Sequence, residues 1–280
     1  SAAARRSTGG DSETPAIPES CVQGPVSQSL SLSIMCWSAN ASGAMTLLGL
    51  AMTLFHIIKG NRYHASLFYT IMEGFQYLQY FYLDSCSQMN WALTHVAHFL
   101  VWYQPIMWNI IGICHSNGNK KVFWVALVMS IITLLVSTGR LIWGDLHPEM
   151  PITLGEAGVA TETCSVMGVM HVKWQWRMPS MSGMEPTFYV WLLTVCTPCF
   201  FWRPFKSGVF VILGTIFGFG ISSYLVGLTG EAYSFWCAIS VPLSLFSLFA
   251  HLQPTKSDAA AGKGGKKATP KGKGKGNKQN

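Results

Sequence analysis

Polar side chains recur inside two long apolar segments of the chain, residues 65–83 and 91–114. Polar groups in a hydrocarbon environment are costly, so they usually face a partner, a cavity or a pathway. The candidate site residues are Glu73, Gln76, Gln79, His95, His98, Trp102, Gln104 and Asn109, with Arg140 at the end of a later apolar segment. Because the two segments run in opposite directions, Glu73 is expected at the depth of Gln104.

Three interpretations of this polar interior stay open. The side chains would be hydrogen-bonding groups between helices, or they would line a cavity with Glu73 at its floor. In such a cavity a buried carboxyl group can carry a proton. The third interpretation is a metal or haem site, since neutral imidazoles are common ligands; its candidates are His95, His98 and His171. No strict metal motif is present.

An enzymatic function has little support. Seven-helix zinc hydrolases would be expected to carry a two-histidine motif in the last helix, whereas His251 stands alone there. A retinal protein is disfavoured as well, because the last helix has no lysine for a Schiff base. The acidic-Arg-aromatic and Asn-Pro-x-x-Tyr signatures of G-protein-coupled receptors are also missing.

The elements that hold these residues follow from the distribution of charge. Only 11% of the 280 residues are charged, against about 25% in soluble domains. Six long runs lack Asp, Glu, Lys and Arg, and each has enough apolar residues for a membrane-spanning helix of about 20 residues. A seventh segment is interrupted only by Glu73. The sequence therefore predicts an all-α membrane protein with seven transmembrane helices, at 34–58, 65–83, 91–114, 122–143, 186–202, 209–228 and 235–252.

Basic residues set the expected orientation. Fourteen of the nineteen lie in the connections after the first, third and fifth helices or in the C-terminal tail. The positive-inside rule then places the N-terminus outside and the C-terminus in the cytoplasm. A plasma membrane or endomembrane is favoured, with an organelle membrane as the alternative.

The two ends of the chain have low-complexity or polar composition. Residues 1–33 are predicted to be a disordered extension. Residues 253–280 are predicted to be a disordered tail rich in Lys and Gly. Such a tail would contact anionic lipid or a protein partner. It gives little reason to expect nucleic acid, since it accounts for much of the net charge of +7. An oligomer is compatible with this composition.

The connection between the fourth and fifth helices is the longest, at residues 144–184. Its stretch 164–178 combines Trp, Lys and Arg, which suits an interfacial helix or a re-entrant segment. On the outer side, disulfide bonds can form. We expect Cys86 to pair with Cys164, with Cys36 as the main competitor.

Several short motifs carry a resemblance to a known family. These are Met-Cys-Trp-Ser-Ala at 35–39, Met-Glu-Gly-Phe-Gln at 72–76, Tyr-Gln-Pro at 103–105 through Asn109, and Cys164 through His171-x-x-Trp174. The chain resembles a family of functionally uncharacterised multi-pass membrane proteins over about residues 35–251. The resemblance implies the fold and marks these polar residues, and it implies no activity.

The sequence therefore predicts that a small ligand or a proton is bound or translocated in a polar cavity between the second, third and fourth helices. Glu73 would be the charged group, with Gln76, His95, His98 and Gln104 as its polar partners. The first alternative is a non-catalytic membrane scaffold or assembly subunit. The second is a membrane protein with a histidine-ligated metal or haem.

Overall fold

The computed structural model describes residues 38–59, 64–83, 85–152, 156, 158–181 and 187–252. For His64 and residues 243–252 it describes the backbone alone. The predictions about the N-terminal extension, Cys36 and the Lys-rich tail lie outside these residues.

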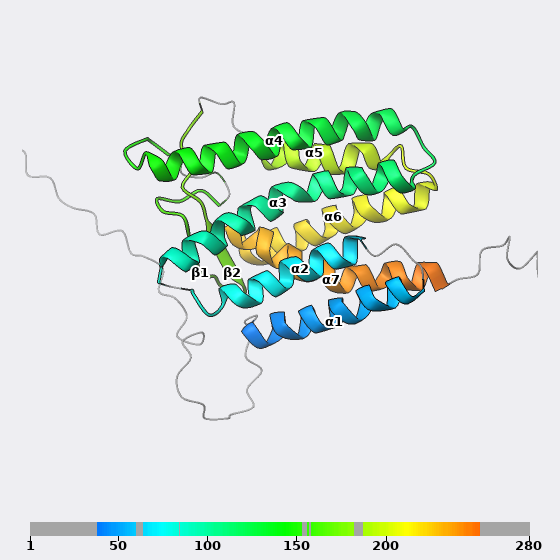
Figure 1. The fold of residues 1–280 in the computed structure, drawn as a ribbon, viewed down its shortest axis with the longest axis horizontal. Coiled ribbons are helices and arrows are strands. Elements are labelled where there is room, and N and C mark those ends of the chain that lie inside the picture. The colour runs from blue at the N-terminus through cyan, green and yellow to red at the C-terminus, as the bar shows by residue number, and fades with distance from the viewer. Residues whose placement is uncertain are drawn as a thin grey trace, which may run out of the picture.

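Seven α-helices form the described fold, as the sequence predicts. They lie side by side with their long axes roughly parallel (Figure 1). Their bounds are α1 Ala39–Ile58, α2 His64–Gln79, α3 Gln88–His115, α4 Lys120–Leu146, α5 Phe188–Cys199, α6 Phe205–Val226 and α7 Gly230–Leu252. The second helix ends at Gln79, four residues before its predicted end.

Side-chain caps explain where three of the helices begin. Ser38 accepts a hydrogen bond from the backbone N–H of Ala41, and Ser87 accepts one from Asn90. The side chain of Asn119 accepts from the N–H of Lys121. Each cap satisfies a backbone donor that has no partner inside its helix.

By length and composition, α1, α4 and α6 are able to cross a membrane. Helices α2 and α5 have 16 and 12 residues, fewer than the about 20 that a span requires. Helix α3 is long enough, but it contains several polar side chains. Of the seven predicted spans, this criterion therefore supports three.

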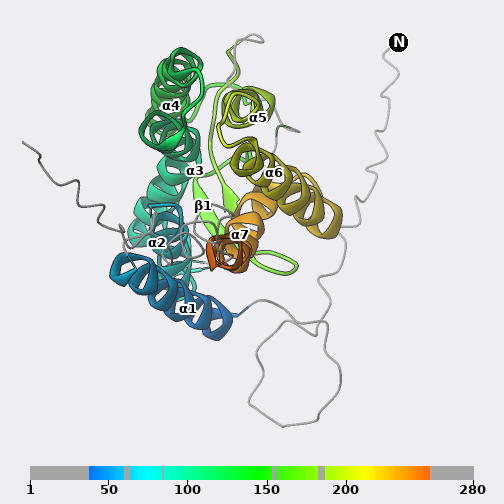
Figure 2. The same ribbon diagram turned by 90° about the vertical axis from the view of Figure 1, so that its right-hand side faces the viewer.

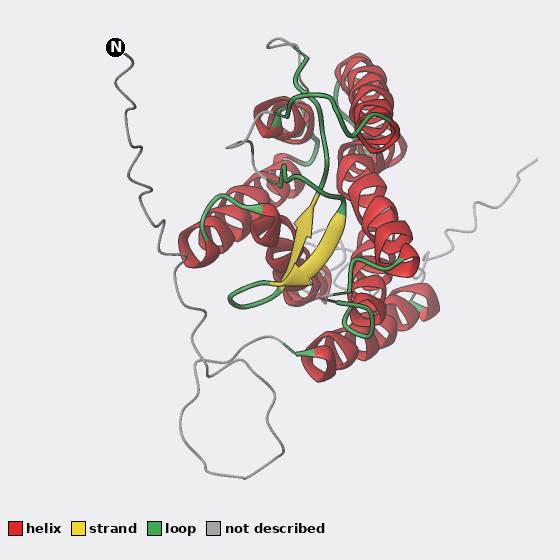
Figure 3. Ribbon diagram, turned by 90° about the vertical axis from the view of Figure 1, so that its left-hand side faces the viewer, coloured by secondary structure: helices red, strands yellow, loops and turns green. Residues whose placement is uncertain are grey.

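The connection between α4 and α5 folds as a β-hairpin, where the sequence suggested an interfacial helix or a re-entrant segment. Strands β1 Cys164–Met167 and β2 Val172–Gln175 pair antiparallel, with Ser165 opposite Trp174. Val172, Trp174 and Trp176 alternate along one face and are almost fully buried. Helices surround the hairpin at one end of the molecule (Figures 2 and 3). The alternation of large apolar residues fits a strand period of two, which is why a hairpin forms here.

Helix pairs approach closely at several glycines. A Cβ atom added to Gly112 of α3 would lie 2.2 Å from the Phe123 ring of α4, and one on Gly49 of α1 would meet Thr70 of α2. Gly214 and Gly220 of α6 instead face open space. Close approaches at glycine therefore join α1 to α2, α3 to α4 and, at Gly208, the start of α6 to the end of α5.

A disulfide bond joins Cys86 to Cys164, the pair that the sequence predicts. It links the α2–α3 connection to the first residue of β1, across 78 residues of sequence. The cross-link therefore ties the hairpin to the same end of the bundle that holds the start of α3.

The first prediction concerns this cross-link. Replacing both cysteines, Cys86→Ser with Cys164→Ser, should lower the stability by about 3 kcal/mol, because a cross-link over a long loop restricts the unfolded chain. Thermal unfolding of the purified protein, followed by tryptophan fluorescence, measures the loss. Cys114→Ser, at an exposed free cysteine, is the control. An unchanged midpoint in the double variant would contradict the prediction.

Candidate functional site

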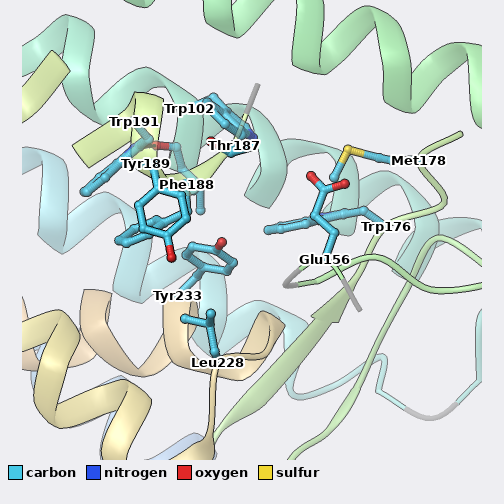
Figure 4. Close-up of a pocket in the computed structure, with 11 residues that line it drawn as sticks. Trp102, Glu156, Trp176, Met178, Thr187, Phe188, Tyr189, Trp191, Leu228 and Tyr233 are labelled. Atoms are coloured by element: carbon cyan, nitrogen blue, oxygen red, sulfur yellow. Dashed lines mark hydrogen bonds between the residues drawn. The ribbon is translucent and has the colours of Figure 1, made fainter. Parts of the chain in front are cut away.

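A cavity of about 190 Å³ lies between α3, α5, the start of α7 and the chain that follows β2. Its lining is mostly aromatic and comes from elements far apart in the sequence (Figure 4). The described lining residues are Val101, Trp102, Glu156, Trp176, Met178, Thr187, Phe188, Tyr189, Trp191, Leu228 and Tyr233.

The rings of the lining are held in place by contacts with one another and by backbone hydrogen bonds. Phe188 stacks on Phe219 with ring centroids 4.0 Å apart and lies 5.8 Å from Tyr233. The indole N–H of Trp191 donates to the carbonyl of Val101 at 2.9 Å. These contacts fix the positions of the rings in the folded protein.

Glu156 supplies the charged group of the described lining. Arg140 of α4 donates to both of its carboxylate oxygens, at 3.0 and 2.8 Å. Arg140 is 4% exposed and also donates through Nε to the carbonyl of Pro179 at 2.6 Å. Such a two-point pair fixes the carboxylate geometry. The sequence marked Arg140, but it placed the residue in a cavity beside α2 rather than behind this wall.

A second cavity of about 220 Å³ adjoins the first. The two share Glu156 and Leu228. Its described lining includes Lys173 of β2 and the backbone around Gly158 and Gly230. The aromatic cavity therefore continues toward a more polar one past Glu156.

Of the sequence-predicted site residues, Trp102 lines the aromatic cavity. Gln79 instead bonds the hairpin: its amide nitrogen donates to the Ser165 hydroxyl at 2.9 Å, and its oxygen accepts from the Trp174 indole at 2.9 Å. Asn109 donates to the carbonyls of Pro105 and Thr194, which ties α3 to α5. For Gln79 and Asn109 the structure therefore gives interhelical or hairpin hydrogen bonds, as the first interpretation has it.

Gln76 of α2 and Gln104 of α3 each donate to α7, and Glu73 lies about one turn before Gln76 on α2. All three are fully buried. Gln76 donates to the carbonyl of Ser234 at 3.3 Å, and Gln104 donates to the sulfur of Cys237 at 3.4 Å. None of the three lines the aromatic cavity.

The three candidate metal-binding histidines point to different partners. His95 Nε2 lies 2.9 Å from a carboxylate oxygen of Asp145. His98 Nε2 lies 3.0 Å from the hydroxyl of Ser137. His171 sits in the hairpin turn, where its Nδ1 accepts from the N–H of Val172 at 2.7 Å. In the described part of the chain, no group of three His, Cys, Asp or Glu residues forms a candidate metal site.

The hairpin turn that carries His171 is held by a carboxylate. Glu231, at the start of α7, accepts hydrogen bonds from the backbone N–H groups of Val169, Met170 and His171. The imidazole itself is fully buried, with Tyr80 and Phe235 as ring neighbours. Burial disfavours the charged imidazolium and lowers the pKa of His171 to about 3.

Sequence reasoning missed most of the aromatic lining. Glu156, Phe188, Trp191 and Tyr233 lie on a connection and on two helices where nothing in the spacing marks them as neighbours. Two signals were available in the sequence. Glu156 and Arg140 are charges of opposite sign at the same end of the bundle, and tryptophan is frequent along residues 174–191.

The fold and site define a seven-helix protein with an aromatic cavity beside an inserted hairpin. Residues 40–255 match a family of unknown function, DUF5765, and the chain belongs to this family. It is similar to Uncharacterized protein R287 of Acanthamoeba polyphaga mimivirus, with 25% identity over 228 residues, which cover 75% of this chain and 93% of the viral protein. No solved structure matches the chain.

The second prediction concerns the Arg140–Glu156 pair. Arg140→Met should lower the stability by about 2 kcal/mol, because it leaves a partly buried carboxylate and the Pro179 carbonyl without their donor. The double variant with Glu156→Gln should lose less than the sum of the single variants, by about 1 kcal/mol. The unfolding midpoints of the two single variants and the double variant complete a double-mutant cycle. Arg203→Met, at an exposed arginine, serves as control. Strict additivity of the two changes would argue against the pair.

The third prediction follows from the lowered pKa of His171. Between its folded value of about 3 and an unfolded value of about 6.5, the unfolded chain takes up a proton that the folded protein does not. Stability should therefore fall as the pH drops below about 6.5, by about 1.3 kcal/mol at pH 5.5 relative to pH 7.

The variant His171→Asn keeps a hydrogen-bonding group near Val172 and removes the titration. Its unfolding midpoint should depend less on pH between 7.5 and 5.5 than that of the unmodified protein. His147→Asn, at a partly exposed histidine, is the matched control. Parallel pH curves for the unmodified protein and His171→Asn would refute the assignment.

Proposed function

We propose that this protein crosses the membrane with all seven helices and binds a small organic cation in the aromatic cavity at its outer end. The observation that carries the binding role is the cavity itself: rings from three helices and the hairpin segment, with a single carboxylate in the described lining.

The distribution of polar and apolar side chains supports seven spans. Gln76, His98 and Gln104 are fully buried, whereas apolar residues of the same helices, such as Ile71 and Phe99, are 52% and 44% exposed. The short helix α5 exposes Leu193 in the same way. Polar groups turned inward under an apolar surface are the arrangement that a bilayer requires.

The two ends of the bundle differ in charge and in covalent chemistry, which supports an outer hairpin. Lys59, Lys120, Lys121, Arg203 and Lys206 lie at one end, as cytoplasmic connections usually do. The opposite end carries the disulfide bond and the carboxylates of Glu156 and Glu231. Disulfides persist outside the cytoplasm. We therefore propose an external N-terminus, an external cavity and a cytoplasmic C-terminus.

The size and lining of the cavity indicate the ligand class. Its volume of about 190 Å³ slightly exceeds that of an engineered cavity of about 150 Å³ that holds benzene. Aromatic cages attract cations through the electron-rich faces of the rings. The Glu156 carboxylate places oxygen acceptors at the wall, and Arg140 balances its charge, so the rings supply the main attraction for a cation. A one-ring ammonium compound fits these properties.

Two other roles predicted from the sequence, translocation and a scaffold, are not part of this proposal. Translocation of a ligand or a proton past Glu73 stays a prediction from the sequence, since Glu73 lies outside the aromatic cavity. The scaffold role and the contact of the Lys-rich tail with lipid or a partner also stay predictions.

The fourth prediction tests the proposed site directly. Benzyltrimethylammonium, added to the protein in nanodiscs, should quench or shift tryptophan fluorescence in a saturable way. It should bind at least tenfold more tightly than benzyl alcohol, because the neutral compound lacks the attraction between a cation and the rings. Tyr233→Leu should weaken binding of the cation about tenfold.

Tyr224→Leu makes the same change at an 89% exposed tyrosine of α6 outside the cavity, so it should leave the affinity unchanged. Benzoate tests the opposite charge. Equal affinities for benzyltrimethylammonium and benzyl alcohol, or equal affinities of Tyr233→Leu and Tyr224→Leu, would reject cation recognition at this site.

A further inference from the structure

The second cavity, which we name the polar cavity, offers room for another part of a ligand. Its volume is about 220 Å³, and its lining shares Glu156 and Leu228 with that of the aromatic cavity. Trp174 lines the polar cavity and Trp176 lines the aromatic one, and their ring centroids are 6.0 Å apart. One small molecule with two different ends can therefore reach both cavities.

Lys173 gives the polar cavity a positive charge. This lysine of β2 lies in the lining, and its ammonium group forms no ion pair with another described residue. The other charged residue of the described lining is Glu156, whose two carboxylate oxygens are both bonded to Arg140. Since Arg140 balances that carboxylate, the charge of Lys173 is left over.

The next acidic group along the chain is bonded elsewhere. Glu231 directly follows Gly230, which lies in the lining of the polar cavity, but Glu231 itself does not line it. Its carboxylate accepts from the backbone N–H groups of Val169 and His171 in the hairpin turn. The turn therefore binds this carboxylate, and Lys173 stays available to an anion from outside the chain.

The backbone of Trp174 adds a hydrogen-bond donor. The residue opposite it in β1 is Ser165, whose N–H and carbonyl are both bonded to the side chain of Asn90. Ser165 and Trp174 are therefore a pair with no ladder hydrogen bonds between them, so the N–H and carbonyl of Trp174 point to the outer edge of β2. Gly158 lies on that edge, where it accepts from the N–H of Trp176, and it lines the polar cavity.

Gly230 brings the start of α7 against the same edge. A Cβ atom added to it would lie 1.8 Å from the carbonyl oxygen of Trp174, so only a glycine fits here. The N-terminus of a helix carries a partial positive charge. The polar cavity thus combines an ammonium group, a backbone N–H donor and the start of a helix, which are groups that bind phosphate in proteins.

We propose that the two cavities together bind a zwitterion, with a quaternary ammonium group among the rings and a phosphate group beside Lys173. The inference rests on the proposed function, because the ammonium group occupies the aromatic cavity. A phosphate diester carries one negative charge, which the ammonium group of Lys173 balances. A choline phosphate group has both charges on one short linker, and its source is either a soluble ester or the headgroup of a membrane lipid.

Ligand titrations of the full chain in a maltoside detergent, which has neither choline nor charge, test the inference. Tryptophan fluorescence gives the affinities for choline, choline phosphate and benzyltrimethylammonium. Choline phosphate should bind about tenfold more tightly than choline, because its phosphate gains charge-assisted hydrogen bonds. Lys173→Gln should remove this advantage, and it should not weaken the binding of benzyltrimethylammonium, which has no anionic group.

Two further variants separate the cavities. Lys206→Gln makes the same change at an exposed lysine of α6, so it should keep the advantage of choline phosphate. Tyr233→Leu changes the aromatic cavity, so it should weaken the binding of choline and choline phosphate alike.

A comparison of glycerophosphocholine with phosphatidylcholine assigns the source of the choline phosphate group. Equal affinities indicate a soluble ester, since the acyl chains then add nothing. Binding of the lipid at least tenfold more tightly indicates a membrane headgroup.

Two results would overturn this inference and leave the proposed function standing. One is an equal affinity for choline and choline phosphate in the unmodified protein, with benzyltrimethylammonium bound as expected. The other is an advantage of choline phosphate that persists in Lys173→Gln, since the phosphate would then lie elsewhere. Absence of binding by benzyltrimethylammonium would overturn the proposed function and this inference with it.

Discussion

The buried position of the β1–β2 hairpin is the constraint on which the rest of this structure depends. Backbone N–H and C=O groups taken out of water must find partners, and helices α3 and α7 supply them to the hairpin. The side chain of Asn90 makes two hydrogen bonds with the backbone of Ser165: it accepts from the N–H at 2.7 Å and donates to the carbonyl at 2.8 Å. Glu231 receives the N–H groups at the turn. The hairpin is thereby fixed at both ends, with a disulfide bond beside Asn90.

This placement forms the aromatic cavity. The chain that leaves β2 carries Trp176 into the bundle, where its indole donates to the carbonyl of Thr94 at 3.4 Å. Three residues later, the carbonyl of Pro179 accepts from Arg140, and Arg140 in turn holds Glu156 against the cavity. A wall built from a connection needs this series of bonds, because a connection lacks the internal hydrogen bonds that keep a helix rigid.

Much of the helical framework was predictable from the sequence, and the site was predictable only in part. Apolar runs mark all seven helices, six of them free of charge and the second interrupted only by Glu73. Two cysteines expected in outer connections mark the disulfide. The hairpin was not predicted, because its Trp and Lys residues also suit a membrane interface. Gln79 shows the limit of the argument from polarity: the pattern says that a polar group is buried, but its partners, Ser165 and Trp174, are 86 and 95 residues away.

Helix α7 contacts three features of the interior: the hairpin turn, the aromatic cavity and the buried amides of Gln76 and Gln104. Within its first two turns, Glu231 binds the hairpin turn, Tyr233 lines the aromatic cavity, and Ser234 and Cys237 accept from the amides of Gln76 and Gln104. The hydroxyl of Ser234 also donates to the carbonyl of Val172 in β2. Because these residues share one rigid helix, a shift of its first turns would change the hairpin contacts, the cavity wall and the buried amides together. The position of α7 is therefore determined by the hairpin as much as by its helical neighbours.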